Sequence, residues 1–288
     1  MNVQQARIWL ERAGTVLSLL AVIFISGRLY TLHQQLDSQM LSALIMPVAL
    51  LSILYGFSCA FTAFAWRDSL AQCGVQISHR DSAWIYGNSQ LAKYIPGNFM
   101  HLLGRQARGI AYGIPAKPLA KSMVLEIVLL CVAGLVLGSF LLPLTTTQVN
   151  IWASVYLVLG MLIALGLAML RPAMHHIARA VLWNVGFLMV SGLVFVFLVA
   201  RLLPGQNPET GMMLYFGAVY VVAWLVGFVT PGAPAGLGVR EIVALTLIGS
   251  LIPEVEILTA IIAGRMVSVL GDTLFFVAVQ KIGSNHSG

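Results

Sequence analysis

Two arginines follow Pro-Gly pairs at the same spacing in this chain, and their chemistry suits an anion. The strings YIPGNFMHLLGR and TPGAPAGLGVR each place an arginine nine residues after the proline, at Arg105 and Arg240. Proline removes a backbone donor and stops a helix, while glycine adopts conformations that other residues resist. A guanidinium group binds a phosphate through two parallel hydrogen bonds. Two helix breaks, each followed by a cation, therefore predict a paired site for an anionic group.

The elements that must position these breaks are membrane helices. The chain has 288 residues, of which 59% are hydrophobic and 9% charged, and its mean hydropathy is +0.91. Apolar runs of roughly 20 residues, long enough to cross about 30 Å of hydrocarbon, recur along the chain. We predict one all-α polytopic membrane domain over residues 1–288, with about seven or eight transmembrane helices. The predicted spans are 13–33, 41–65, 123–144, 150–170, 181–203, 212–230 and 255–280.

Two further apolar stretches, 84–103 and 239–252, are interrupted by proline, glycine and charge. We predict broken or re-entrant elements there, the first inside a polar cytoplasmic or re-entrant segment, 66–122, and the second inside 230–252. Irregular backbone at membrane depth must be buried in protein or line a water-filled cavity. The similarity of the two elements suggests an internal repeat, and paired breaks are typical of a transporter's central site. Four spans between them favour entry from the same side of the membrane, but the parity changes if one broken element crosses, so an inverted and a parallel repeat both remain open.

The distribution of lysine and arginine predicts the orientation. Arg7 and Arg12 precede the first span, the segments 66–122 and 171–180 are rich in cations, and 145–149 has none. Because cytoplasmic loops carry the positive charge, the pattern predicts a protein of the cytoplasmic (inner) membrane with its N-terminus inside. The first span lacks the cleavage site of a secretory signal and is expected to be a retained anchor. No basic run is interleaved with exposed aromatics, so no nucleic-acid partner is predicted.

The first break is followed by a short predicted helix with a basic face. His101, Arg105 and Arg108 are four and three residues apart, so they share one side of that helix. The N-terminal end of the helix presents free N–H groups and itself attracts an anion. An alternative for Arg108, Lys117 and Lys121 is that they are ordinary positive charges of a cytoplasmic surface helix.

Ionisable residues also fall inside apolar spans, at Glu126, Arg265 and Asp272. Each costs roughly 2.5–3.5 kcal/mol at the bilayer centre, so each should face the protein interior with a partner. Arg265 and Asp272 are seven residues apart and share a helix face. Two interpretations remain open, namely structural pairs (Arg265 with Asp272, Glu126 with an arginine) or a role in transport. Glu241, in the first turn of a helix, is equally a partner for the helix dipole.

The cysteines and the paired histidines give no reason to predict a cofactor or a metal. Cys59, Cys73 and Cys131 have the spacing of neither a disulfide framework nor a metal site. His175 and His176 have no carboxylate or cysteine near them in sequence at ligand spacing.

The strings LAKYIPGNFMHLLGR and TPGAPAGLGVRE, together with Glu126, resemble the membrane region of the lysylphosphatidylglycerol synthase and flippase-like family. The similarity extends over nearly the whole chain, with Ala233 standing where that family's pattern has glycine. It implies movement of lipids between leaflets, without the aminoacyl transfer that belongs to a separate synthase domain. It also implies site roles for Lys93, Tyr94, Pro96, Gly97, Gly104, Arg105, Pro231, Gly232, Gly236, Gly238, Arg240 and Glu241.

The resulting hypothesis is a lipid translocator. An anionic phospholipid or polyprenyl-phosphate-linked lipid would be held by Arg105, Arg240 and helix N-termini in a polar cavity. One alternative is a membrane-embedded enzyme acting on lipid phosphates or transferring sugars, if Glu126, Glu241 and Asp272 converge. Another is a noncatalytic membrane partner of a separate synthase or glycosyltransferase.

Overall fold

The chain folds as an all-α, multi-pass membrane protein. The structure, a computed structural model, describes residues 38–94, 100–141, 151–203, 209–230, 233–249 and 251–283, and these ranges contain helices without strands. Six of the described helices are long and apolar enough to cross a membrane. They are α2 (Ser38–Gln72), α5 (Ala116–Gly138), α7 (Ile151–Met169), α8 (His175–Leu202), α9 (Thr210–Val229) and α11 (Glu254–Gly283). These match six predicted spans, and the predicted span 13–33 lies outside the described residues.

Helix α2 runs seven residues beyond its predicted end, because its polar residues find partners on α8. The Asp68 carboxylate is fully buried and lies 3.3 Å from Arg179 Nε, and it accepts a hydrogen bond of 3.2 Å from Trp183 Nε1. Arg67 Nη1 lies 3.1 Å from the same carboxylate. Because these groups satisfy the charge, the helix continues to Gln72, and the polar segment predicted from residue 66 begins inside α2.

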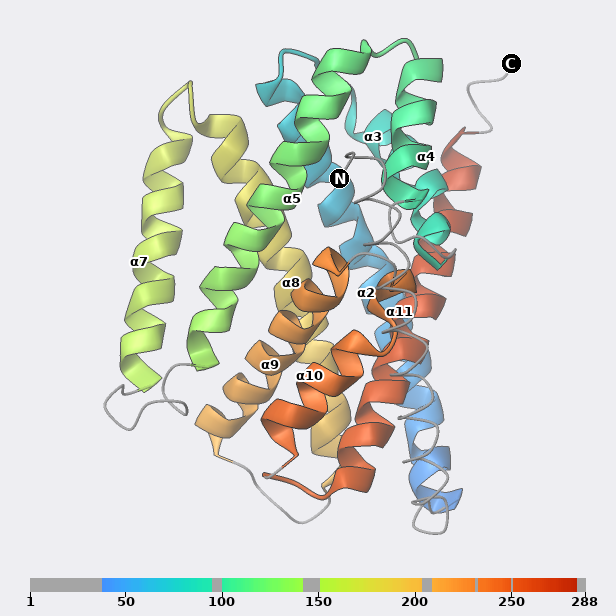
Figure 1. The fold of residues 1–288 in the computed structure, drawn as a ribbon, viewed down its shortest axis with the longest axis vertical. Coiled ribbons are helices and arrows are strands. Elements are labelled where there is room, and N and C mark those ends of the chain that lie inside the picture. Colours follow the sequence, from blue (N-terminus) through green and yellow to red (C-terminus); the bar gives the residue numbers. More distant parts are fainter. Residues whose placement is uncertain are drawn as a thin grey trace, which may run out of the picture.

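The long helices pack around α2, α8 and α11, with α7 at the outer edge (Figure 1). Aromatic rings join the central helices, since Tyr55 and Phe187 make an edge-to-face contact at 5.7 Å and Phe187 makes another with Trp224 at 5.5 Å. On α7, Trp152 and Tyr156 are exposed. Such a helix suits a lipid-facing position, because the hydrocarbon of the bilayer receives its apolar side chains.

Shorter elements form two hairpins. In the first hairpin, α3 (His79–Gln90) and η2 (Leu91–Tyr94) descend and α4 (Met100–Ala111) returns. In the second hairpin, α9 ascends to η4 (Pro234–Gly236), and α10 (Val239–Ile248) descends. Figure 1 shows the first hairpin in the upper half of the molecule and the second in the lower half, with the two tips near mid-height. The tips are in contact, since η2 packs against η4.

The two hairpins therefore enter from opposite ends of the molecule, and not from the same side, the arrangement that the count of spans favoured. That expectation counted α9 as a complete crossing, as its length and composition suggest. In the structure the upper end of α9 lies near mid-height, where α9 joins η4 as the ascending arm of the second hairpin (Figure 1). The opposed arrangement is that of an inverted pair of broken elements.

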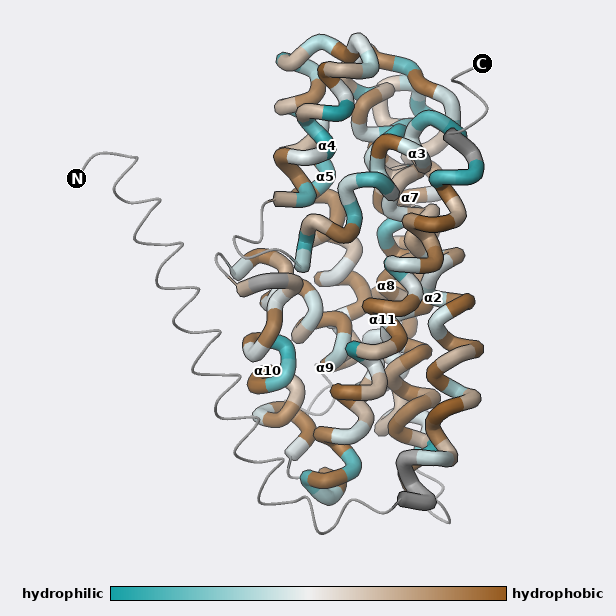
Figure 2. The backbone as a smooth tube through the Cα atoms, turned by 90° about the vertical axis from the view of Figure 1, so that its right-hand side faces the viewer, coloured by the Kyte–Doolittle hydropathy of each residue, from teal (hydrophilic) through white to brown (hydrophobic). Residues whose placement is uncertain are grey.

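Polar residues gather at the upper end, where α3, α4 and α5 meet, while the long helices are mostly hydrophobic (Figure 2). The start of α3 lies in this polar zone. Ser78 is its N-cap, and the Ser78 hydroxyl accepts a hydrogen bond of 3.0 Å from the backbone N–H of Asp81. This cap satisfies one of the free donors of the first turn and fixes where the first hairpin begins to descend.

Candidate functional site

Helix α11 makes an ion pair with each hairpin. Lys93 Nζ, in η2, lies 2.6 Å from Asp272 Oδ2, and Arg265 Nε lies 2.6 Å from Glu241 Oε1 at the start of α10. Arg265 Nη1 also donates to the backbone oxygen of Ala235, at 2.9 Å. The two α11 residues fall in the middle third of the helix, about 10 Å apart along its axis. The Arg265–Asp272 pair considered from the sequence is replaced by these two pairs, which tie α11 to both tips.

The buried Asp272 carboxylate is fully enclosed by donors from three other elements, η2, α3 and α2. Tyr94 donates from its hydroxyl at 2.5 Å and Gln90 from its amide at 3.1 Å, in addition to the Lys93 ammonium. The Cys59 thiol of α2 makes a weaker contact of 3.5 Å. A buried carboxylate needs such partners to remain charged. Asp272 is therefore the anchor of the first hairpin tip.

Arg105 is neutralised by Glu126. Its Nη2 lies 2.5 Å from Glu126 Oε2, and the Tyr86 hydroxyl donates to the other carboxylate oxygen at 3.1 Å. The guanidinium also lies over the rings of Tyr86, at 4.3 Å, and Trp66, at 5.4 Å. The residue is only 1% exposed. The pair of Glu126 with an arginine, one of the interpretations left open by the sequence, is the one that forms.

Small residues shape the tip of the second hairpin. Gly236 and Gly238 have φ angles of 68° and 86°, in the region that favours glycine. A Cβ atom added at Gly236 would lie 2.7 Å from the Cα of Gly227 and 2.8 Å from Arg240 Nε. The backbones of α9 and η4 therefore approach closely at this point. The Arg240 side chain passes directly beside the contact.

Arg240 is the cation of the site that has no carboxylate partner among the described residues. Its guanidinium lies 5.0 Å from the centre of the Trp224 ring, and its Nε is enclosed without a hydrogen-bond acceptor. The described site thus holds four cations and three carboxylates. The cations are Lys93, Arg105, Arg240 and Arg265, and the carboxylates are Glu126, Glu241 and Asp272. One positive charge is left over.

A small cavity of about 40 Å³ lies between the two hairpins and the long helices. This is room for about two or three water molecules. His101 at the start of α4 and Arg240 at the start of α10 both line it, so two helix N-termini are directed to the same place. Its lining also includes Tyr86, Lys93, Glu126 and Asn184.

Enclosed donors without an acceptor lie at and beside this cavity. They include Asn184 Nδ2 and Arg240 Nε, with Arg105 Nε next to its Glu126 partner. Buried N–H groups of this kind need an acceptor, supplied by water or by a ligand. A phosphate or carboxylate oxygen meets that need and also the surplus positive charge.

The remaining predicted residues have the following places. Gly104 lies on α4, where an added Cβ would meet Ser89 at an ordinary 3.8 Å. The predicted site residues Pro96, Gly97, Pro231 and Gly232 lie outside the described ranges. Among the described residues no group of His, Cys, Asp and Glu is arranged to hold a metal ion. The three site carboxylates each pair with a different cation.

Three residues of the site were not predicted from the sequence, namely Tyr86, Gln90 and Asn184. Tyr86 and Gln90 are four residues apart on α3, a spacing that puts both on the side facing the site. Asn184 is a buried amide inside the long apolar helix α8. The sequence did contain a signal for these three site residues, namely their polarity, because polar groups inside a membrane protein rarely face lipid.

Comparison with known proteins leaves the geometry as the guide to function. No protein-family model matches the chain, and no curated protein matches it. The charges of the site and the two opposed hairpins are therefore the features from which a function can be inferred.

Proposed function

We propose that the protein moves the anionic headgroup of a lipid across the cytoplasmic membrane. The observation that carries the proposal is Arg240, a cation without a carboxylate partner in the described site, beside a cavity between two opposed hairpins. The resemblance of the two Pro-Gly strings to flippase-like membrane regions supports the same class. Opposed broken helices with their N-termini directed at the middle of the membrane are a recurrent design for transporting anions.

The charge distribution supports an orientation with the upper end in the cytoplasm. Arg108, Lys117 and Lys121 lie at the ends of α4 and α5 there, and Arg171 lies in the turn between α7 and α8. Positive loops face the cytoplasm, so the first hairpin would enter from the cytoplasmic side and the second from the opposite side. With the N-terminus also inside, the predicted span 13–33 and α2 would run in opposite directions.

Transport requires the hairpin tips to separate. The 40 Å³ cavity holds a few waters and is too small for a lipid headgroup, so a substrate enters only when η2 and η4 move apart. The headgroup phosphate would then bind Arg240 and the N–H groups at the start of α4 and α10, while the acyl chains stay in the bilayer. A net bias in one direction needs unequal affinity in the two open states.

The test is headgroup movement in proteoliposomes containing fluorescent phosphatidylglycerol, read by chemical quenching of the outer leaflet. Arg240→Ala should slow movement by roughly 10-fold to 100-fold, the effect of losing hydrogen bonds to a charged group. Arg240→Lys should recover part of the rate, because it restores charge without the planar fork.

Arg108→Ala is the matched control, since Arg108 is an exposed arginine of α4 in the first hairpin, whereas Arg240 belongs to the second. It should leave the rate unchanged. A folded Arg240→Ala protein that moves the lipid at the full rate would refute the proposal.

A further inference from the structure

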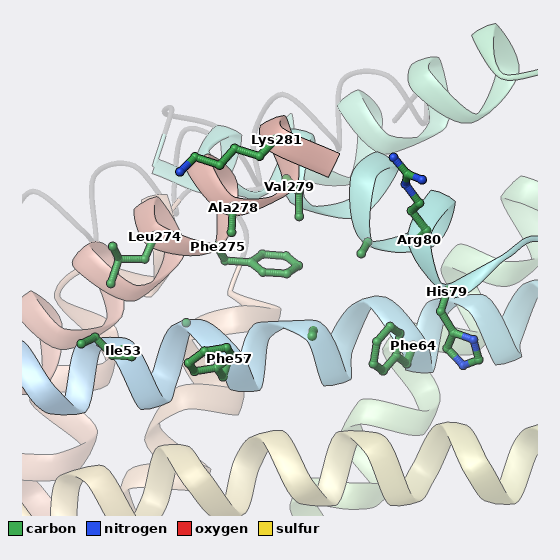
Figure 3. A pocket seen from close by; sticks show the side chains of 13 residues that line it. Ile53, Phe57, Phe64, His79, Arg80, Leu274, Phe275, Ala278, Val279 and Lys281 are labelled. Atoms are coloured by element: carbon green, nitrogen blue, oxygen red, sulfur yellow. The ribbon is translucent and has the colours of Figure 1, made fainter. Parts of the chain in front are cut away.

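An apolar groove separate from the central cavity lies where α2, α3 and α11 diverge. Its volume is about 800 Å³, within the range of ligand-binding pockets. Figure 3 shows the side chains that line it, with Ile53 and Phe57 on α2 and Leu274 and Phe275 on α11. We call it the α2–α11 groove. None of the ion pairs of the central site belongs to it.

The groove is open because small residues line it, although α11 contacts α2 at one end of the groove and α3 at the other. Below it, α2 meets α11, since a Cβ added at Gly56 would lie 3.0 Å from the backbone oxygen of Gly271. Above it, α3 meets α11, since a Cβ added at Gly87 would lie 2.7 Å from the Val279 side chain. Between these contacts the lining includes Ala60, Ala83 and Ala278, whose short side chains leave the space empty.

The groove has the length of one lipid leaflet. Its α2 wall runs from Ile53 to Phe64, about 16 Å at 1.5 Å per residue. Half of the roughly 30 Å hydrocarbon core of a bilayer is about 15 Å. An acyl chain extended along the groove would therefore reach from the membrane surface to the bilayer midplane.

Two cations line the groove, Arg80 at the start of α3 and Lys281 at the end of α11. Figure 3 shows Arg80 at the end near Phe64 and His79, whereas the Lys281 side chain extends from the last turns of α11 toward Leu274. His79 lies there too, with its ring 4.9 Å from that of Phe64. Burial and the nearby Arg67 lower the pKa of His79, so the charges at neutral pH are those of Arg80 and Lys281.

We propose that the α2–α11 groove binds one anionic phospholipid of the adjacent leaflet, with an acyl chain along α2 and the phosphate at Arg80 and Lys281. Apolar walls one leaflet long and two lining cations, one of them on a flexible lysine side chain, match both parts of this molecule. This binding is separate from the proposed transport, and it does not depend on Arg240. Either proposal can fail while the other stands.

The positive charge of Arg80 and Lys281 favours an anionic phospholipid over a protein helix as the occupant of the groove. The predicted span 13–33 is preceded by Arg7 and Arg12 and belongs to the same chain. A second copy of the chain would bring a further Arg80 and Lys281. In both cases cations would meet cations at the polar end, whereas a phosphate is attracted to them.

The experiment places a photoreactive benzophenone side chain at Phe57, which is 73% exposed, in the full-length protein. The protein is reconstituted in phosphatidylcholine vesicles containing a minor fraction of phosphatidylglycerol. Mass spectrometry of the irradiated protein should find phosphatidylglycerol attached several-fold above its share of the membrane. Each cation removed, by Arg80→Gln or Lys281→Gln, should reduce this enrichment by roughly 5-fold.

Four further variants distinguish a specific binding site from general contact with lipid. Benzophenone at Tyr156, 68% exposed on α7, should capture lipids in the proportion of the vesicles. Arg171→Gln, a charge removed at the same end of the molecule, should leave enrichment at position 57 unchanged. Ala278→Phe should fill the groove and abolish the enrichment, whereas Ala164→Phe on the exposed face of α7 should not.

Three outcomes would overturn the proposal. Capture of a peptide from residues 13–33 would show that the chain fills its own groove. Capture of a second copy would make the groove an interface between copies. Lipid capture without enrichment of phosphatidylglycerol would show only the general contact of an exposed helix with the bilayer.

Discussion

The Lys93 ammonium lies 2.6 Å from the carboxylate of Asp272, although the two residues are separated by most of the chain. The Lys93 side chain is 14% exposed and that of Asp272 is fully buried. This pair joins the tip of one hairpin to the middle of α11. The strength of that connection can be measured.

Asp272→Asn should destabilise the protein by about 3–5 kcal/mol, because it leaves the Lys93 ammonium mostly buried without a counter-charge. The double variant Lys93→Gln with Asp272→Asn should lose less than the sum of the two single variants. Unfolding in detergent, followed by circular dichroism, measures all three. Additive losses would mean that the two groups do not interact.

Arg105→Gln should cost about 3–5 kcal/mol of stability, because Glu126 would remain buried without its cation. Arg105→Lys should cost less, since it keeps the charge and loses the contacts of the guanidinium plane with Tyr86 and Trp66. Chemical denaturation provides the comparison. If lysine is as damaging as glutamine, the planar stacking outweighs the charge.

Gly236→Ala and Gly104→Ala should behave differently, although both glycines belong to the two similar motifs. At Gly236 an added methyl group meets Gly227 and Arg240 in a backbone with φ of 68°, so η4 must shift and lipid movement should fall at least about 10-fold. At Gly104 the nearest atom is 3.8 Å away, and alanine favours the helix by about 0.5–1 kcal/mol. The proteoliposome assay and thermal unfolding should separate them. Equal effects at both positions would contradict this distinction.

Asp68→Asn should weaken the contact between α2 and α8 by about 2 kcal/mol, since the carboxylate holds Arg179 and the Trp183 indole at hydrogen-bonding distance. The lipid-movement rate at low temperature should be unchanged, because Asp68 does not line the central cavity. A loss of rate in a fully folded variant would contradict a purely structural role.

The sequence contained the membrane helices but left their pairings open. Six spans followed from runs of apolar residues, because crossing hydrocarbon imposes a length that composition reveals. The breaks at the two motifs followed from proline and glycine in the same way. The partners of Asp272, Glu126 and Arg265 depend on which helices are neighbours, which no local pattern records. The end of α2 was predicted seven residues too early for the same reason, since the Asp68 carboxylate finds its partners Arg179 and Trp183 on α8.

One helix, α11, makes an ion pair with each of the two hairpins. Asp272 and Arg265 are two turns apart on α11, one holding η2 and the other holding the start of α10. If the protein moves lipids as proposed, a tilt of α11 about Ser268 would lengthen one of these ion pairs while compressing the other. Only one hairpin tip would then be released at a time, and leakage of small ions would be limited without any additional element.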